Sequence, residues 1–232
     1  MVMPSGKYVP MKYVMITFLP GSAGNFFTRC LNLLSGGYCF IEKNSKKLPL
    51  TIEEKLRMLN YNSVSNLSFD ERNWISFESS LDFYFSVQAH HDLPQNSYSI
   101  WLGHPNTSTG AISLAELAGP DDKCYSFYID PGKKFKWCFI NALYKNSQID
   151  VKYFVNAKKL MANDSVYKIN FENFLQGWDY FLLEFQKVCN IIEHNMSCQE
   201  VAAIKILYFQ WQQTILKHDD IDAFKHQIGF DM

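Results

Sequence analysis

The fold is decided by one stretch, residues 13–34: Tyr13-Val14-Met15-Ile16-Thr17-Phe18-Leu19-Pro20-Gly21-Ser22-Ala23-Gly24-Asn25-Phe26-Phe27-Thr28-Arg29-Cys30-Leu31-Asn32-Leu33-Leu34. Residues 13–19 are almost all β-branched, aromatic or aliphatic, which predicts a strand that is buried on both faces. Pro20 ends this strand because it has no N–H to donate. Small residues then permit a tight turn, and apolar residues at helical spacing follow. The stretch therefore predicts a strand, a loop and a helix.

The start of this helix is the chain's best functional clue. Asn25 is expected to be the N-cap residue, because its short side chain can accept a hydrogen bond from the first turn. A helix start presents unpaired N–H groups and the positive end of the helix dipole, which together suit phosphate or sulfate. An ordinary strand-to-helix turn in an α/β core would use the same residue types, so that interpretation stays open.

The common phosphate-binding and hydrolase motifs do not fit the chain. A P-loop NTPase would place lysine after the second glycine of G-x-x-x-x-G-K-[ST], and no lysine follows Gly24. The G-x-G-x-x-G of dinucleotide-binding folds and the G-x-S-x-G of Ser-His hydrolases are also absent from the sequence. What remains is a phosphate-loop shape without its usual lysine.

The composition is that of a globular protein. The 232 residues suit one domain, and 47% hydrophobic against 19% charged residues excludes a disordered chain. The net charge of −1 gives no reason to expect nucleic-acid binding. Six scattered cysteines without C-x-x-C spacing indicate buried thiols rather than a metal site or a disulfide framework. With no apolar run long enough to span a membrane and no signal peptide, we expect a cytoplasmic protein.

The rest of the chain alternates between strand and helix patterns. An irregular arm over 1–12 precedes the first strand, and a helix is expected from Thr51 to about Leu59. Strands are predicted over 84–88, 97–103 and 166–170, with the apolar runs 124–129 and 135–140 as a hairpin or two strands and a helix beginning near Ala142. The part 172–217 is expected to be helical, with one helix over 175–193 despite Gly177 and another capped by Ser197.

Three histidines follow predicted strands. His90 and His91 come directly after the strand 84–88, and His104 follows the strand 97–103. Ligands of open parallel sheets bind beyond the carboxyl ends of the strands. We therefore expect these histidines near the glycine loop, with a surface turn as the open alternative for His90 and His91.

With these residues in place, the chain resembles the sulfotransferase family over about a quarter of its length. Residues Phe18–Phe26 are similar in layout to the family's phosphosulfate-binding loop, Ala89–Pro94 to the segment with the catalytic histidine, and Ile169–Leu175 to a late strand-and-helix motif. The resemblance implies a single-domain three-layer α/β sandwich over 1–232, with a mainly parallel central sheet, a P-loop-like start and long C-terminal helices. The loop's basic residue is missing here. The strand-end Arg and Ser that grip the 3′-phosphate have only a poor counterpart in 140–147.

The resemblance implies transfer of a sulfuryl group from 3′-phosphoadenosine 5′-phosphosulfate to a hydroxyl of a carbohydrate or small metabolite. His90 or His91 would be the general base, since histidine titrates near neutrality. His104 and Glu172 would contact the acceptor, and Lys133, Lys134, Lys136 or Lys145 would supply the missing charge. The donor would be bound by the loop and helix start, namely Gly21, Ser22, Ala23, Gly24, Asn25, Phe26 and Thr28. A nucleotide-sugar-dependent glycosyltransferase and a non-catalytic α/β binding protein stay open as alternatives.

Overall fold

The structure, a computed structural model, describes residues 12–38, 51–59, 98–103, 121–145 and 166–215. Within these ranges five strands form one sheet in the order β2-β3-β1-β4-β5, and every neighbouring pair is parallel. The strands are β1 (Lys12–Phe18), β2 (Gly37–Tyr38), β3 (Tyr98–Gly103), β4 (Lys123–Asp130) and β5 (Tyr167–Asn170). The predicted α/β class with a parallel sheet is confirmed, as are the strands expected over 13–19, 97–103, 124–129 and 166–170.

The first strand is the centre of the sheet. Val14 of β1 is in register with Ile100 of β3 on one side and with Tyr125 of β4 on the other. After β1 the chain continues to β2 on one side of the centre, and after β4 it continues to β5 on the other side. The adjacent strands β1 and β4 thus send their connections in opposite directions. In open α/β sheets this arrangement leaves a crevice at the carboxyl ends of the two strands.

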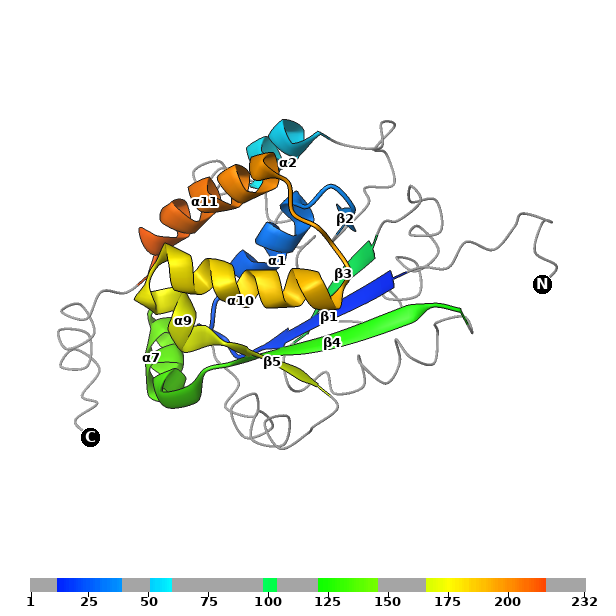
Figure 1. Ribbon diagram of the computed structural model, residues 1–232. Helices are drawn as coiled ribbons and strands as arrows, with labels where there is room; N and C mark the ends of the chain where they lie inside the picture. The colour runs from blue at the N-terminus through cyan, green and yellow to red at the C-terminus, as the bar shows by residue number, and fades with distance from the viewer. Residues whose placement is uncertain (1–11, 39–50, 60–97, 104–120, 146–165, 216–232) are drawn as a thin grey trace.

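The described helices lie on one side of the sheet and at its carboxyl edge (Figure 1). They are α1 (Gly24–Leu33), α2 (Ile52–Leu59), α7 (Phe135–Lys145) after the 3-10 turn η3 (Gly132–Lys134), α9 (Phe171–Gln176), α10 (Trp178–Ile191) and α11 (Cys198–Gln212). Figure 1 shows α1, α10 and α11 on the same side of the sheet, with α7 and α9 beside the carboxyl ends of the strands. The described loops after β1, β4 and β5 each lead into a helix.

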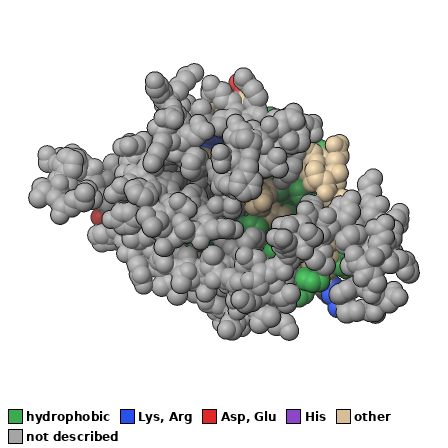
Figure 2. Space-filling view, turned by 180° about the vertical axis from the view of Figure 1, so that it is seen from behind, with side chains coloured by type: hydrophobic (Ala, Val, Ile, Leu, Met, Phe, Trp, Pro, Cys, Tyr) green, Lys and Arg blue, Asp and Glu red, His purple; other side chains and the backbone are tan. Residues whose placement is uncertain are grey.

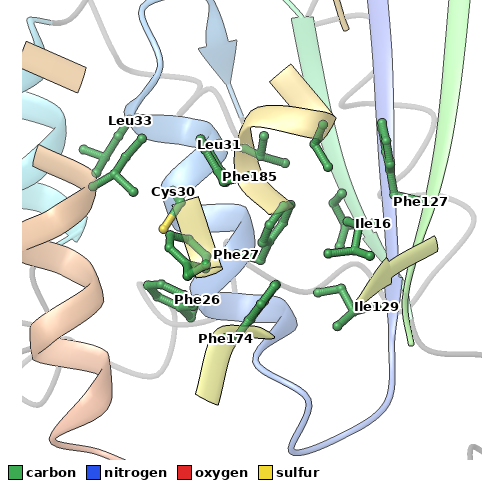
Figure 3. Packing of buried hydrophobic residues seen from close by; sticks show 14 of the residues in the cluster. Ile16, Phe26, Phe27, Cys30, Leu31, Leu33, Phe127, Ile129, Phe174 and Phe185 are labelled. Atoms are coloured by element: carbon green, nitrogen blue, oxygen red, sulfur yellow. The ribbon is translucent and has the colours of Figure 1, made fainter. Parts of the chain in front are cut away.

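The core lies between the sheet and α1, α10 and α11. Alternate residues of β1, such as Val14 and Ile16, belong to this core, while Tyr13 and Met15 on the opposite face are also buried. The prediction of a strand buried on both faces is therefore confirmed. Figure 3 shows the side chains of Phe26 and Phe27 among the hydrophobic residues of this cluster.

Aromatic rings join the first helix to the last. The ring of Phe26 stacks on that of Trp211 with centroids 4.5 Å apart, and the ring of Phe27 stacks on that of Phe174 at 5.5 Å. Phe185 meets Phe27 edge-on at 5.3 Å. Because such pairs add roughly 0.5–1.5 kcal/mol each beyond their buried area, these contacts fix α1 firmly against the C-terminal helices.

The run 135–140 is helical, so the predicted strand or hairpin is wrong. Phe135–Lys145 form α7, and Ala142 lies near its end rather than at its beginning. Pro131 precedes a 3-10 turn in which the Lys134 N–H bonds the Pro131 carbonyl at 2.8 Å, and this turn leads directly into the helix. A short apolar run has no period that separates a strand from a buried helix, so the tertiary packing decides.

The expected start of α1 needs correction. The N-cap residue is Ala23, not Asn25, because Ala23 is left-handed (φ 64°) and its carbonyl already accepts the N–H of Phe27 at 2.9 Å. At the other end of the helix, Leu34 is an extended C-cap (φ −63°, ψ 146°). Gly37 enters β2, where a Cβ would fall on the carbonyl oxygen of Leu31.

The C-terminal helical part contains one more break than the sequence predicts. Gly177 (φ 140°) separates α9 from α10, so the single helix expected over 175–193 does not form. The Ser197 cap is confirmed, although α11 ends at Gln212. Of the described cysteines, Cys30, Cys138 and Cys189 are buried as expected, but Cys124 and Cys198 are exposed.

Candidate functional site

The candidate site lies at the carboxyl ends of β1 and β4, where the connections diverge. The loop Leu19–Ala23 follows β1 and leads into α1. The turn Asp130–Lys134 follows β4 and leads into α7. Both loops therefore border the crevice that the topology predicts as a ligand position.

A short turn gives the loop its shape. The N–H and the hydroxyl of Ser22 both donate to the carbonyl of Leu19, at 3.0 and 2.7 Å, and Ser22 is fully buried. Its hydroxyl hydrogen is thus used within the turn. Ala23 then adopts the left-handed conformation that starts the helix. The loop is a defined turn that reverses the chain within a few residues.

Two glycines let the loop pack closely against its surroundings. Gly21 is left-handed (φ 84°), and a Cβ there would fall on the carbonyl oxygen of Cys138 in α7. At Gly24 a Cβ would fall on the ring of Phe18. The side-chain amide of Asn141 donates to the Gly21 carbonyl at 3.1 Å, so α7 holds the loop from its other side. Larger residues at either glycine would displace the loop.

The start of α1 is open. No side chain caps it, and its first turn contains no acidic residue. The N–H groups of Gly24, Asn25 and Phe26 precede the first intrahelical bond and have no acceptor inside the helix. Partial positive charge therefore collects at the mouth of the crevice, which favours an anion.

Two buried polar atoms close to this start lack partners within the described ranges. They are Oγ1 of Thr28 and Oδ1 of Asn141, in side chains that are 1% and 2% exposed. A buried polar atom without a partner costs roughly 1–3 kcal/mol. The Asn141 amide nitrogen is already bonded to Gly21, which leaves its oxygen beside the loop.

The neighbouring turns at the same edge are closed by the protein's own side chains. Asp130 accepts the N–H of Gly132 at 3.0 Å, and Glu172 accepts the N–H of Lys133 at 2.7 Å. Asn170 caps α9 by accepting the N–H of Glu172 at 3.0 Å. The carboxylate of Glu172, predicted as a substrate contact, is therefore engaged in joining the two turns, and it lies on β5's side of β4, away from the loop.

The far end of α1 is anchored by two buried charges. The ammonium of Lys55 donates to the carbonyls of Leu34 and Gly37, at 2.7 and 2.8 Å. The carboxylate of Glu200 accepts the N–H of Ser35 at 2.6 Å and lies 3.1 Å from the ring nitrogen of His194. Burial lowers the pKa of Lys55 to about 8, partly opposed by Glu200. Burial would raise the pKa of Glu200, but hydrogen bonds from His194, Ser197 and Ser35 lower it to about 2.

The sequence-predicted site residues separate into two groups. The structure describes the loop residues, Thr28 and Glu172, and brings the loop and Asn141 together. His90, His91 and His104 lie outside the described residues. Lys145 is at the end of α7, while Lys133 and Lys134 belong to the turn after β4. Asn141 lies in 140–147, the segment that is a poor counterpart of the 3′-phosphate-binding motif. Nothing in the sequence indicates its contact with Gly21.

Only a small part of the described surface is visible in Figure 2. On the face seen in Figure 2, described side chains show in small areas where hydrophobic, basic and acidic types are all represented. Within the described ranges, no cluster of three or more histidine, cysteine or acidic residues could hold a metal ion. None of the described helices is long and apolar enough to cross a membrane.

The helix start favours an anion over a neutral ligand. Its open N–H groups and the Thr28 hydroxyl can donate to an anion, whereas the unpartnered oxygen of Asn141 can only accept a hydrogen bond. Among residues 19–25 there is no lysine or arginine, so full positive charge must come from elsewhere. No protein-family model matches this chain, and a search of curated proteins finds no relative.

Proposed function

We propose that the protein is a transferase of the sulfotransferase type, which moves a sulfuryl group from 3′-phosphoadenosine 5′-phosphosulfate to a hydroxyl group. The observation that carries the proposal is the open start of α1 at the point where the connections of β1 and β4 diverge. An anion would be stabilised there by N–H groups that no described side chain caps. The sequence resemblance of residues 18–26 and 169–175 adds the reaction type, and with it a three-layer, P-loop-like architecture.

The protein's share of this chemistry is binding, alignment and proton transfer. When bound, the donor supplies an activated sulfuryl group on its phosphate. The N–H groups of Gly24, Asn25 and Phe26 hold the phosphate and favour the charge it gains when it leaves. His90 or His91 takes the proton of the acceptor hydroxyl while its oxygen forms the new bond to sulfur. The bond from sulfur to the phosphate oxygen breaks, and adenosine 3′,5′-bisphosphate is the product.

The acceptor is proposed to be a carbohydrate or small metabolite hydroxyl. The described part of the site provides groups that would bind the sulfuryl donor. Contacts with the acceptor substrate are assigned to His104 from the sequence alone. The acceptor contact of Glu172 stays a prediction, and its carboxylate also accepts the N–H of Lys133.

The test measures thermal unfolding of the full chain with and without adenosine 3′,5′-bisphosphate, using a nucleotide sugar as the comparison. A ligand at about a hundred times its dissociation constant stabilises the folded state by roughly 2.7 kcal/mol. We expect the bisphosphate alone to raise the melting temperature. A shift with the nucleotide sugar instead would favour a glycosyltransferase, and no shift with either would favour a non-catalytic binding protein.

A substitution at Thr28 tests whether the ligand contacts α1. Thr28→Val keeps the size of the side chain but removes the unpartnered hydroxyl, so the ligand-free protein should keep its stability within about 1 kcal/mol. If the hydroxyl meets the ligand, the bisphosphate-induced shift becomes smaller. An unchanged shift would separate Thr28 from the site.

A further inference from the structure

The connection between α10 and α11 meets the sheet at the edge opposite the candidate site. Glu193–Ser197 form this connection, the strap, which leads from the end of α10 to the N-cap of α11 (Figure 1). The first residues of three neighbouring strands contact it, and they lie in register: Tyr98 of β3, Lys12 of β1 and Lys123 of β4. The strap therefore joins the C-terminal helices to the amino edge of the sheet.

One end of the strap is held by exposed charges. The carboxylate of Glu193 lies 3.0 Å from the ammonium of Lys12 and 2.8 Å from that of Lys123. Lys12 also donates to the carbonyl of Ile192 at 3.0 Å. The left-handed backbone of Glu193 (φ 61°) turns the chain out of α10 toward this edge. Tyr125 of β4 is a further titratable group that interacts with Glu193.

The other end of the strap is held by a buried carboxylate. Glu200 of α11, which is 2% exposed, accepts the N–H of Ser197 at 2.7 Å and its hydroxyl at 2.9 Å. It also lies 3.1 Å from Nε2 of His194, whose ring meets that of Tyr98 edge-on at 5.8 Å. The same carboxylate accepts the N–H of Ser35 after the end of α1. One ionised group thus joins the strap, α11 and the end of α1.

The helices on either side of the strap are held differently. The buried rings of Phe181 in α10 and Tyr208 in α11 stack with centroids 5.1 Å apart, and acid does not change the charge of either ring. Within the strap no side chain is buried, and Met196 only packs against the core from its border. The attachment of the strap therefore depends mainly on two carboxylates, those of Glu193 and Glu200.

We infer that the strap is an acid-sensitive element: protonation of Glu193 and Glu200 releases it from the amino edge while α10 and α11 stay packed. The pKa of each carboxylate is lowered from 4.5 to about 2, so the closed strap is favoured above pH 4.5 and loses this stabilisation as the pH falls toward 2. Lys55 of α2 and Cys189 of α10 also interact with Glu200, but they do not titrate in this range, because their pKa values are about 8 and about 12. The inference does not depend on the proposed function.

The experiment is amide hydrogen exchange, followed by NMR in the full chain from pH 7 to pH 3. The amides of Ser197 and Ser35 both donate to Glu200. Their protection should fall by roughly thirtyfold between pH 7 and pH 3, the ratio that linkage gives for a pKa of 4.5 in the open state and about 2 in the closed state. The amide of Phe185, inside α10, should keep its protection, because the helix stays packed.

Two variants assign the effect to the carboxylates. Glu200→Gln should lower the protection of Ser197 and Ser35 already at pH 7 and remove most of its acid dependence. Glu193→Gln is the exposed counterpart. It should lower the protection of the His194 amide, which bonds the Cys189 carbonyl at 2.8 Å, by roughly two- to fivefold, and added salt should do the same to the unmodified chain.

Two results would overturn the inference. Protection of Ser197 and Ser35 that is unchanged at pH 3 would show that the carboxylates do not hold the strap. Equal loss of protection at Ser197 and Phe185 would show that acid unfolds the molecule as a whole. Both results come from the unmodified chain, so they decide the question even if Glu200→Gln does not fold.

Discussion

The two ends of α1 differ in how their backbone groups are used. At the C-terminal end, a buried ammonium bonds the carbonyls of Leu34 and Gly37, and a buried carboxylate bonds the N–H of Ser35. At the N-terminal end, neither a charge nor a capping side chain meets the first N–H groups. One helix is thus strongly anchored at one end and open at the other. One capping side chain at the open end would stabilise the fold, and under the proposed function that end is left free for a ligand.

The largest effect is expected from Gly24→Leu. The new Cβ would fall on the ring of Phe18, so the loop or the first strand must shift. Overpacking a fixed contact in a core costs up to about 3 kcal/mol, and we expect a loss of about that size in urea unfolding together with the loss of bisphosphate binding. Asn25→Ala, on the exposed side of the same turn, is the control. Normal binding by Gly24→Leu would show that the open end needs no defined loop.

The next effect concerns the anchored end. Glu200→Gln removes the charge that accepts hydrogen bonds from Ser35 and Ser197, which should cost about 2 kcal/mol at pH 7. The pKa of Glu200 is lowered from 4.5 to about 2 in the folded protein, so the carboxylate stabilises the fold above pH 4.5. That contribution is lost as the pH falls toward 2. Urea unfolding at pH 7, 5 and 3 should therefore show the gap between the variant and the unmodified chain narrowing with acid.

Glu193→Gln is the matched control for this pH dependence. Glu193 is exposed and pairs with Lys12 and Lys123 at 3.0 and 2.8 Å. We expect a much smaller change at pH 7, because exposed ion pairs contribute little. A gap for Glu200→Gln that stays constant down to pH 3 would contradict the assigned role of its charge.

A smaller effect should follow when one of the closed turns is opened. Glu172→Ala removes the acceptor of the Lys133 N–H and should lower the unfolding free energy by about 1 kcal/mol. Bisphosphate affinity should not change, because this carboxylate belongs to the β4–β5 side of the edge. Glu172→Gln keeps an acceptor and should be intermediate in stability. A selective loss of affinity in Glu172→Ala would return Glu172 to the site.

The smallest stability change is the sharpest test of the open end. Asn25→Asp adds an acid to the first turn of α1, which should stabilise the ligand-free protein by about 0.5 kcal/mol through the helix dipole. The same carboxylate should weaken bisphosphate binding, because it either occupies the position of the phosphate or repels the phosphate from it. Opposite signs for stability and affinity distinguish a ligand site from a merely uncapped helix. Tighter binding would contradict the proposal.

Strong local signals account for what the sequence predicts correctly. The strand 13–19 is an unbroken apolar run ended by Pro20, and Ser197 with Glu200 is a capping box that the structure contains in full. The parallel sheet follows from strands separated by helices. In each of these cases the relevant residues are close together in the chain, so the local pattern and the tertiary structure agree.

Long-range packing explains the failures. Asn25 is a better cap than Ala23 by intrinsic preference, but Gly24 must lie against Phe18, and the turn bonded by Ser22 starts the helix earlier. The run 135–140 belongs to the helix α7, which meets Gly21 through Cys138 and Asn141. Gly21 lies over a hundred residues away in the chain, so the local pattern carries no sign of this packing. Asn141 could not be predicted as part of the loop's surroundings, since nothing near it in the sequence indicates that contact. The position of His90, His91 and His104 near the glycine loop stays a prediction.

The ring stack of Phe26 on Trp211 also has a consequence for how the chain is made. The helix α1 completes its packing only with residues that are translated much later, because Phe26 and Phe27 contact rings from Phe174 to Trp211. During synthesis the glycine loop and its helix therefore keep two aromatic side chains uncovered until those residues have been added. Such late, non-local contacts slow folding and expose apolar surface in the nascent chain. The stretch 13–34 is thus made before its packing partners and reaches its native environment late.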